Sequence, residues 1–307
     1  MPRTSFDFSL RSKMLWSALD GKFRLWSQDG TPPNIVLTYR ESADAINWTA
    51  PVTISQGIDR RGISIIDQGV PGSQRFKNLF YWIRYGAGTD GVYPESSPDG
   101  INWTTMTSAP IFQPGVVDDI ADLVVNPFTG GYWFFAKVYG DPNNTNTRQT
   151  WVSHGTPQFS GWTTPVPAFT PDAYDTGVTQ FWGVAGGPIM RDGVALMLLR
   201  VLRDDVGAME WRTTPTPAYY PRGIGYSVLA WSRDGIAFNR ARVPFMSGRR
   251  GTWDEALVWA FGLTEKDATL YITYSGNSDG RANGPKNSGY ATMPSADFTI
   301  NSDGYNP

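Results

Sequence analysis

Residues 97–103 read SPDGINW, and residues 42–48 read SADAINW. The two segments share Ser, Asp, Ile, Asn and Trp at the same offsets, 55 positions apart. A third version, SRDGIAF, occupies residues 232–238, and a degenerate version occupies residues 153–162. The serines that begin the four versions are separated by 55, 56 and 79 residues. A phrase that returns at such intervals is typical of an array of similar supersecondary units.

The segments around each copy predict the local structure. Each copy follows an apolar or alternating run that is rich in β-branched and aromatic residues, as strands are. These runs are NIVLTYR (34–40), LFYWIRYG (79–86), YWFFAKVYG (132–140) and GYSVLAWS (225–232). A polar turn and a short proline-containing stretch come next, APVTI in one case and APIF in another. The pattern predicts a hairpin whose turn is capped by Ser and Asp, with Gly supplying the permissive backbone angle and Trp folding back over the strands.

A second series of residues runs in phase with the first. Asp67, Asp119, Asp175 and Asp254 each open an apolar run, with gaps of 52, 56 and 79 residues. We find no amphipathic pattern of helical length. The sequence therefore predicts an all-β fold, in which antiparallel units of four strands repeat radially as the blades of a β-propeller. At roughly 60 residues per unit, residues 1–307 form a single five-bladed domain. The approximate blades are 1–50, 51–107, 108–166, 167–245 and 246–307.

The composition excludes several classes of partner and site. The formal net charge is −2 and 18% of the residues are charged, so no basic face indicates nucleic acid or an anionic membrane. No apolar stretch is long enough to span a membrane, and MPRTSFDFSLRSK lacks the apolar core of a signal peptide. We therefore expect a cytoplasmic or virion-associated protein. There is no cysteine, and His154 is the only histidine, so we expect no metal site, no Ser-His-Asp triad and no cofactor.

The repeated phrase also resembles a known motif. Ser-x-Asp-Gly-x-x-Trp is similar to the Asp box of sialidases and other carbohydrate-active propellers, where it is a structural turn far from the active site. With VVDDIADLVVNPFTGGYWFFAKV (116–138), GTWDEALVWAFG (251–262) and LYITYSG (270–276), the chain resembles the five-bladed glycosidases. That group holds arabinanases, β-xylosidases, invertases and levansucrases. The invertase signature and the sialidase Arg-Ile-Pro motif are absent, so the family within this superfamily stays open.

The aspartate series provides the first catalytic candidates. In a propeller the starts of the innermost strands converge on one mouth of the central channel, and the series falls at those predicted starts. Glycoside hydrolysis needs one carboxyl group to protonate the leaving oxygen and another to activate water or attack the sugar. We expect Asp119 to be the base or nucleophile, and Asp67 and Asp175 to orient substrate or tune pKa values; Asp254 is a further candidate of the series. Asp118 is adjacent to Asp119, and on a strand only one of the two can face the channel.

The glutamates provide the acid by elimination. Glu41 and Glu95 lie next to the repeated turns, and Glu265 lies in a polar turn. This leaves Glu255, at a predicted strand start, and Glu210 in the enlarged fourth unit. In the glycosidases that the chain resembles, a Glu often serves as the general acid beside Asp residues of other blades. We expect Glu255 or Glu210 to take that role.

Four further residues are candidates for substrate binding. Trp182 and Trp253 lie near predicted inner strands, and an indole face suits the apolar face of a sugar ring. The alternative is that these rings only pack between sheets. Arg60 and Arg203 can bind an acidic sugar by bidentate pairing; the alternative is that they are solvated loop residues.

These patterns favour a glycoside hydrolase that acts on an oligosaccharide or polysaccharide. The alternative is a carbohydrate-binding propeller without turnover, such as a host-recognition or virion protein. An enzyme requires two or three of the candidate carboxylates in one pocket. Their separation is expected to be about 5–5.5 Å in a retaining enzyme or about 6.5–9.5 Å in an inverting one.

Overall fold

The computed structural model describes residues 1–5, 11–29, 36–55, 59–61, 63–83, 90–113, 115–117, 120–141, 144–175, 179–203, 223–278 and 287–300. Within these ranges the regular structure is β-strand apart from one short 3-10 turn, η1 (Ser295–Asp297). None of the described segments is a helix long and apolar enough to cross a membrane. The expected all-β class is confirmed.

Three sheets are formed by strands that follow one another along the chain, each pairing antiparallel with the next. The first contains β2 (Arg11–Ser17), β3 (Lys22–Asp29), β4 (Val36–Ser42) and β5 (Val52–Ser55). The second contains β6 (Asp59–Arg61) and β7 (Ile66–Asp67), which both pair with β8 (Phe76–Ile83), and then β9 (Gly91–Ser97) and β10 (Thr104–Thr105). The third contains β11 (Ala121–Val125), β12 (Tyr132–Asp141), β13 (Asn144–Gly155) and β14 (Val166–Phe169).

A larger sheet of eight strands contains two further antiparallel runs. One run is β15 (Thr179–Arg191), β16 (Val194–Arg203), β17 (Ile224–Ser232) and β18 (Asn239–Arg240). The other is β19 (Leu257–Lys266), β20 (Thr269–Asn277), β21 (Asn287–Pro294) and β1 (Arg3–Ser5). Parallel pairing between the two runs is limited to Gly186 with Gly262 and Gly225 with Leu257. The described chain therefore holds five antiparallel runs of similar build.

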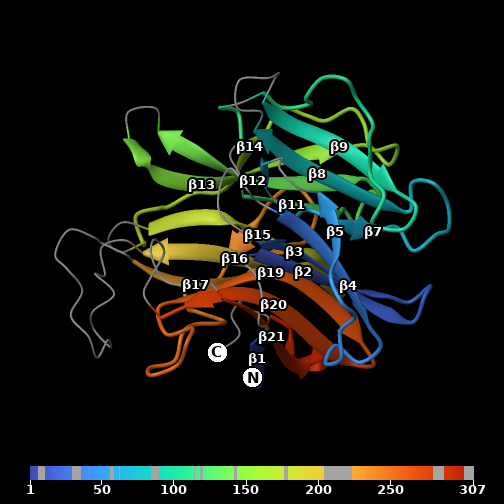
Figure 1. The fold of residues 1–307 in the computed structure, drawn as a ribbon. Helices are drawn as coiled ribbons and strands as arrows, with labels where there is room; N and C mark the ends of the chain where they lie inside the picture. Colours follow the sequence, from blue (N-terminus) through green and yellow to red (C-terminus); the bar gives the residue numbers. More distant parts are fainter. Residues whose placement is uncertain are drawn as a thin grey trace.

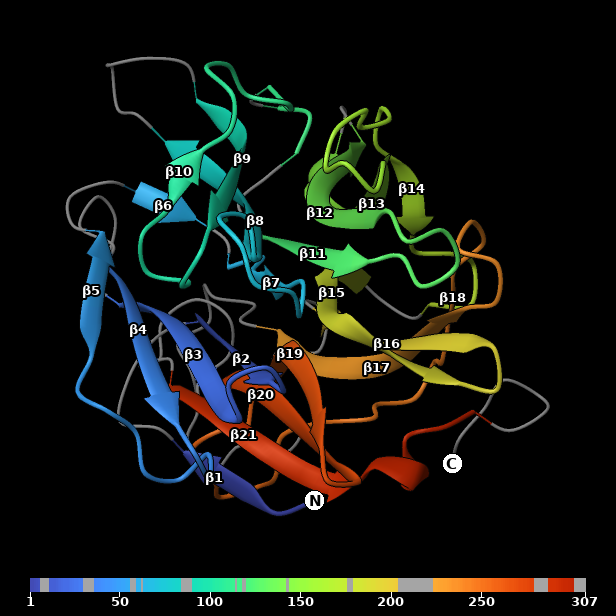
Figure 2. The same ribbon diagram turned by 90° about the vertical axis from the view of Figure 1, so that its right-hand side faces the viewer.

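The five runs are arranged around a common centre. Figure 1 shows them from the side, and Figure 2 shows their strands radiating outward, with β2, β7, β11, β15 and β19 nearest the middle. Each of these inner strands contacts the inner strand of the next run, and β19 contacts β2, so the ring is closed. The N-terminal strand β1 pairs with β21 and completes the last run. The first and the last strands of the chain thus pair in one sheet.

The expected blade boundaries need correction by a few residues. β5 pairs with β4, so the first run extends to residue 55 and not to residue 50. β14 pairs with β13, so the third run extends to residue 169. The fifth run borrows β1 from the segment expected to begin the first blade. Edge strands of two to four residues carry too little pattern to be assigned from sequence.

The repeated phrase forms the hairpin that the sequence predicts. The Asp99 carboxylate accepts the backbone N–H groups two and three positions ahead, each at 2.8 Å, and Trp103 donates its indole N–H to the carbonyl of Gly100 at 3.0 Å. The turn at 42–48 has the same bonds, with Ala45 at φ 62° where Gly100 has φ 80°. Each such turn follows the third strand of a run and leads into the fourth.

Aromatic side chains fill the space between neighbouring sheets. Trp26 of β3 is fully buried and meets Phe76 of β8 edge-on, with ring centroids 5.8 Å apart. Trp133 of β12 is also fully buried and contacts Phe238, which follows β17, at 5.4 Å. The aromatic excess of the sequence is therefore used largely for packing sheet against sheet.

Candidate functional site

The inner strands define two ends of a central axis. Their C-terminal ends meet around one cavity, which we call the C-terminal end of the axis. The starts of three of them meet in an apolar cluster at the other end, made by Ile120, Trp182, Leu202, Leu257 and Trp259. β19 is ten residues long, so at about 3.3 Å per residue the two ends are roughly 30 Å apart. Residues at opposite ends cannot share a pocket.

The cavity at the C-terminal end has a volume of about 250 Å³. Every inner strand contributes to its wall: Leu15 from β2, Asp67 from β7, Val125 from β11, Ile189 from β15 and Glu265 from β19. Of the expected catalytic carboxylates that the structure describes, Asp67 alone lines it. Glu265, expected in a polar turn, is exposed and lies one residue before the end of β19, where it also lines the cavity.

Asp67 ends an inner strand and does not begin one, contrary to the expected phase. Its carboxylate accepts hydrogen bonds from Arg75 at 2.8 and 3.0 Å and from Ser17 at 2.9 Å. Burial alone would raise the pKa of Asp67, but the Arg75 guanidinium, the Gly69 amide and the Ser17 hydroxyl outweigh it, and the pKa lies below its usual value. The group stays ionised and suits hydrogen-bond acceptance better than proton donation.

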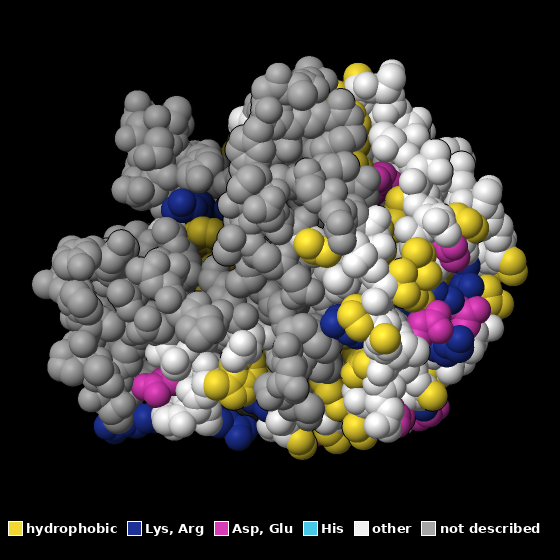
Figure 3. Space-filling model, in the orientation of Figure 1, with side chains coloured by type: hydrophobic (Ala, Val, Ile, Leu, Met, Phe, Trp, Pro, Cys, Tyr) yellow, Lys and Arg dark blue, Asp and Glu magenta, His cyan; other side chains and the backbone are white. Residues whose placement is uncertain are grey.

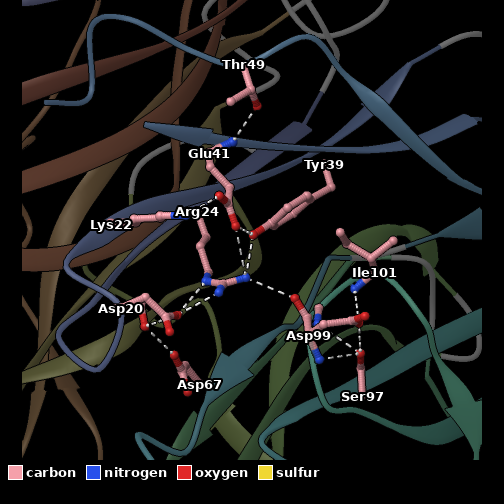
Figure 4. A network of polar contacts seen from close by, with 12 residues as sticks. Asp20, Lys22, Arg24, Tyr39, Glu41, Thr49, Asp67, Ser97, Asp99 and Ile101 are labelled. Atoms are coloured by element: carbon pink, nitrogen blue, oxygen red, sulfur yellow. Dashed lines mark hydrogen bonds and ion pairs between the residues drawn. The ribbon is translucent and has the colours of Figure 1, made fainter. Parts of the chain in front are cut away.

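A network of charged side chains extends outward from Asp67 (Figure 4). Arg75 also pairs with Asp20 at 2.6 Å, and Asp20 pairs with Arg24 at 2.6 Å. Arg24 donates to the carbonyl of Asp99 at 2.9 Å. The network therefore ties the repeated turn of the second sheet to the first sheet, at the same end of the axis as the cavity.

Asp254 lies at the opposite end, before β19, and is held by the N-terminal strand. Its carboxylate pairs with Arg3 at 2.6 Å and accepts the hydroxyls of Thr252 at 2.6 Å and Tyr274 at 3.1 Å. The side chain is 2% exposed. Trp253 stacks on the Tyr274 ring at 5.6 Å and 17°. Asp254 therefore fastens β1 to the last run, and Trp253 packs on β20 of the same run.

Glu255 is also buried, and its carboxylate accepts the backbone N–H of Gly251 at 2.8 Å. This bond closes the turn that precedes β19. Asp175 pairs with Arg240 of the outermost strand β18 at 2.5 Å. Glu255 thus stabilises a turn and Asp175 binds an outer strand, and the structure does not bring the two carboxylates together at one pocket.

Trp182 lies at the start of β15 and is 7% exposed. Its ring contacts the Trp259 ring at 5.1 Å, the Lys137 ammonium at 4.4 Å and the Arg148 guanidinium at 4.7 Å. Gln180 accepts hydrogen bonds from Arg148 at 3.1 Å and from the Trp182 indole at 3.2 Å. The indole therefore supports two cations at the N-terminal end and offers little free face to a sugar.

Of the other expected residues, one lies at the N-terminal end, and the structure does not describe the side chains of the rest. Arg203 is the last residue of β16, half-buried, at the same end as Trp182. Arg60 lies in β6, but its side chain is outside the described part of the structure. Asp119 and Glu210 both lie outside the described residues.

A buried ion pair separates the two ends. Lys13 of β2 and Asp122 of β11 are 2.6 Å apart, and their side chains are 1% and 2% exposed. Asp122 also accepts the backbone N–H of Gly186 in β15. Burial raises the pKa of Asp122, and the Lys13 ammonium and the Arg200 guanidinium oppose that rise. Lys13 lines the cavity, and Asp122 lies two positions after Ile120 of the apolar cluster, so the pair lies between the two ends.

Sequence reasoning missed this pair. Each member interrupts a strand pattern, Lys13 in RSKMLWS and Asp122 in ADLVV, and a charge inside such a run is a signal of buried pairing. The partner, 109 positions away, is not visible in either run.

Charges on the surface are also paired. On the face drawn in Figure 3, acidic and basic side chains of the described residues lie next to each other and form no extended patch of one sign. Among the residues that the structure describes, no group of three or more His, Asp or Glu side chains is arranged to hold a metal ion.

Solved structures resemble this arrangement, although no protein-family model and no curated protein sequence matches the chain. An N-acetylgalactosamine deacetylase from F. plautii, in complex with blood group B trisaccharide, is similar over 95% of this chain and 94% of its own, with TM-score 0.64 and 12% identity. A glycoside hydrolase is similar over 94% and 90%, with TM-score 0.61 and 10% identity. A glycosyl hydrolase from Bacteroides ovatus is similar over 92% and 82%, with TM-score 0.59 and 13% identity. At these identities the similarity is one of fold.

Proposed function

We propose that the chain is a single-domain five-bladed β-propeller that hydrolyses glycosidic bonds in an oligosaccharide or polysaccharide. The observation that carries the proposal is the closed ring of five antiparallel runs, shared over at least 92% of this chain with glycoside hydrolases. Fold alone does not determine activity, so the assignment also depends on the carboxylates at the ring centre.

The N-terminal end of the axis is the proposed catalytic end. The repeated turns lie at the C-terminal end, and in the propellers whose Asp box they resemble such turns lie far from the active site. Asp119 precedes β11 by two positions and belongs in sequence to the N-terminal end. Glu210 lies in sequence between Arg203, which ends β16, and Ile224, which begins β17, at the same end. We assign base or nucleophile to Asp119 and general acid to Glu210.

The contacts of Glu255 argue against it as the acid, and the proposal therefore keeps Glu210. The Glu255 carboxylate is buried and closes a turn of its own loop, whereas a general acid needs access to the glycosidic oxygen. Lys137, Arg148 and Arg203 lie at the same end, where cations stabilise an ionised carboxylate base and lower its pKa.

A specific observation favours the alternative of a carbohydrate-binding protein without turnover. Asp67, Asp175 and Asp254 each pair with an arginine at 2.8 Å or less. In each pair the guanidinium occupies carboxylate oxygens that would otherwise face a substrate. If Asp119 and Glu210 have comparable partners, the ring binds sugar but does not cleave it.

The test is the release of reducing sugar from a panel of plant, fungal and bacterial-envelope glycans. We expect Asp119→Asn and Glu210→Gln each to lower the rate by about a hundredfold or more, as positioned acid–base groups do. Asp172→Asn is the matched control, because Asp172 pairs with the exposed Arg242, and it should keep full activity. Glycan binding without release by the wild type would establish the alternative function.

A further inference from the structure

We propose that the cavity at the C-terminal end of the axis is a second carbohydrate site, which binds one neutral sugar ring independently of the proposed catalytic end. This goes beyond the proposed function, because the Lys13–Asp122 pair stands between the two ends. Lys13 itself lines the cavity, so a ligand there meets the buried pair as its floor.

The size of the cavity fits a single ring. Pockets for drug-sized ligands usually measure about 300–1,000 Å³, and this one measures about 250 Å³. A chain of several sugars would not fit inside it. One ring at the end or side of a glycan would.

The wall combines apolar surface with a few hydrogen-bonding groups. Leu15, Ile66, Val125 and Ile189 present aliphatic carbon. Thr264 accepts the Trp16 backbone N–H at 2.8 Å, and its own hydroxyl hydrogen stays available to a ligand. A sugar ring matches this wall, because its C–H face packs on aliphatic carbon while its hydroxyls reach polar groups at the edge.

Glu265 is the carboxylate of the wall that accepts those hydroxyls. Asp67 also lines the wall, but its two oxygens already accept hydrogen bonds from Arg75, Ser17 and the Gly69 amide. The Glu265 side chain is 37% exposed and lies 3.3 Å from Arg191, at the cavity rim. Hydrogen bonds from hydroxyls to carboxylates are charge-assisted and among the stronger ones.

The charge balance of the wall selects a neutral ligand. Asp67 pairs with Arg75, Glu265 with Arg191, and Lys13 with Asp122, so each charged lining group has a partner of opposite sign. An anion would face the two carboxylates, and a cation would have to compete with arginines already in place. A hydroxylated uncharged ring meets neither the repulsion nor the competition.

The experiment is titration of the full chain with free glucose, galactose, mannose, xylose, arabinose and N-acetylgalactosamine, monitored by ligand-observed NMR. We expect at least one of them to bind at millimolar concentration. Val125→Phe, which fills the cavity without removing a polar bond, should weaken binding about tenfold or more, equal to 1.4 kcal/mol. Val166→Phe is the matched control, since Val166 is exposed on the edge strand β14, outside the cavity.

Glu265→Gln is the second variant and changes no volume. We expect it to weaken binding severalfold, which remains measurable if Val125→Phe does not fold. Absence of binding by all six sugars, or binding unchanged in both variants, overturns the proposal. Asp119→Asn should leave this binding intact and Val125→Phe should leave glycan cleavage intact, so failure of either site is distinguished from failure of the other.

Discussion

The two ends of the central axis use carboxylates in different ways. At the N-terminal end, Asp254 is 2% exposed and fastens the strand that closes the ring. At the C-terminal end, Asp67 lines a cavity, and its two oxygens accept hydrogen bonds from Arg75, Ser17 and the Gly69 amide. An aspartate at a strand boundary is therefore not a catalytic signal in itself. What decides its role is which element supplies the opposite charge.

The largest effect is expected at the pair that separates the two ends. Lys13→Met leaves Asp122 as an unpaired charge in a fully buried position, which typically costs about 3–5 kcal/mol. The measurement is the free energy of unfolding from urea denaturation. The double variant Lys13→Met/Asp122→Leu removes both charges and should recover most of the loss. A single-variant loss below about 1 kcal/mol would mean that the axis is hydrated between the ends, since water would then solvate Asp122.

A smaller effect is expected where the ring closes. Arg3→Met removes the Asp254 ion pair at 2.6 Å and the hydrogen bond to the Ser247 carbonyl at 2.7 Å. Hydrogen bonds to charged groups contribute about 1.5–3 kcal/mol, and we expect a loss of unfolding free energy in that range.

Arg242→Met is the matched control for the ring closure. Its partner Asp172 is 45% exposed and Arg242 is 46% exposed, so solvent screens the pair and the loss should stay below about 1 kcal/mol. Equal losses in the two variants would show that β1 does not depend on Asp254, and the contrast between the two ends would lose its basis.

The sequence predicted the fold better than it predicted the site. Recurrence of Ser-x-Asp in 42–48, 97–103 and 232–238 depends on bonds within a few residues, so each copy is readable locally and predicts the hairpin. The pairing of Asp254 with Arg3 spans 251 positions, and no local pattern contains it. The phase of the aspartate series failed at Asp67 because the inner strand of the second sheet is divided into two short pieces, β6 and β7, and Asp67 ends the second piece.

The smallest effect is expected in the stability of the fold at acid pH. Burial would raise the pKa of Asp99, but the amides of Asn102 and Ile101 outweigh it and lower the pKa to about 2 from 3.8. A lowered pKa in the folded state contributes stability above the unfolded value, and that contribution is lost as pH falls through the folded value. Asp67, whose pKa is also lowered, acts in the same direction at the same end.

The melting temperature should therefore be nearly constant from pH 7 to about pH 5 and fall between about pH 4 and pH 2. Asp99→Ala should melt lower at neutral pH and show a shallower fall over that acid range, because it has lost one of the groups that titrate there. Circular dichroism melts at half-unit pH steps measure both slopes. Parallel curves for wild type and variant would place the acid-sensitive groups elsewhere. Because Asp99 is partly solvated, the expected difference is a few degrees at most, since screening reduces what such bonds contribute.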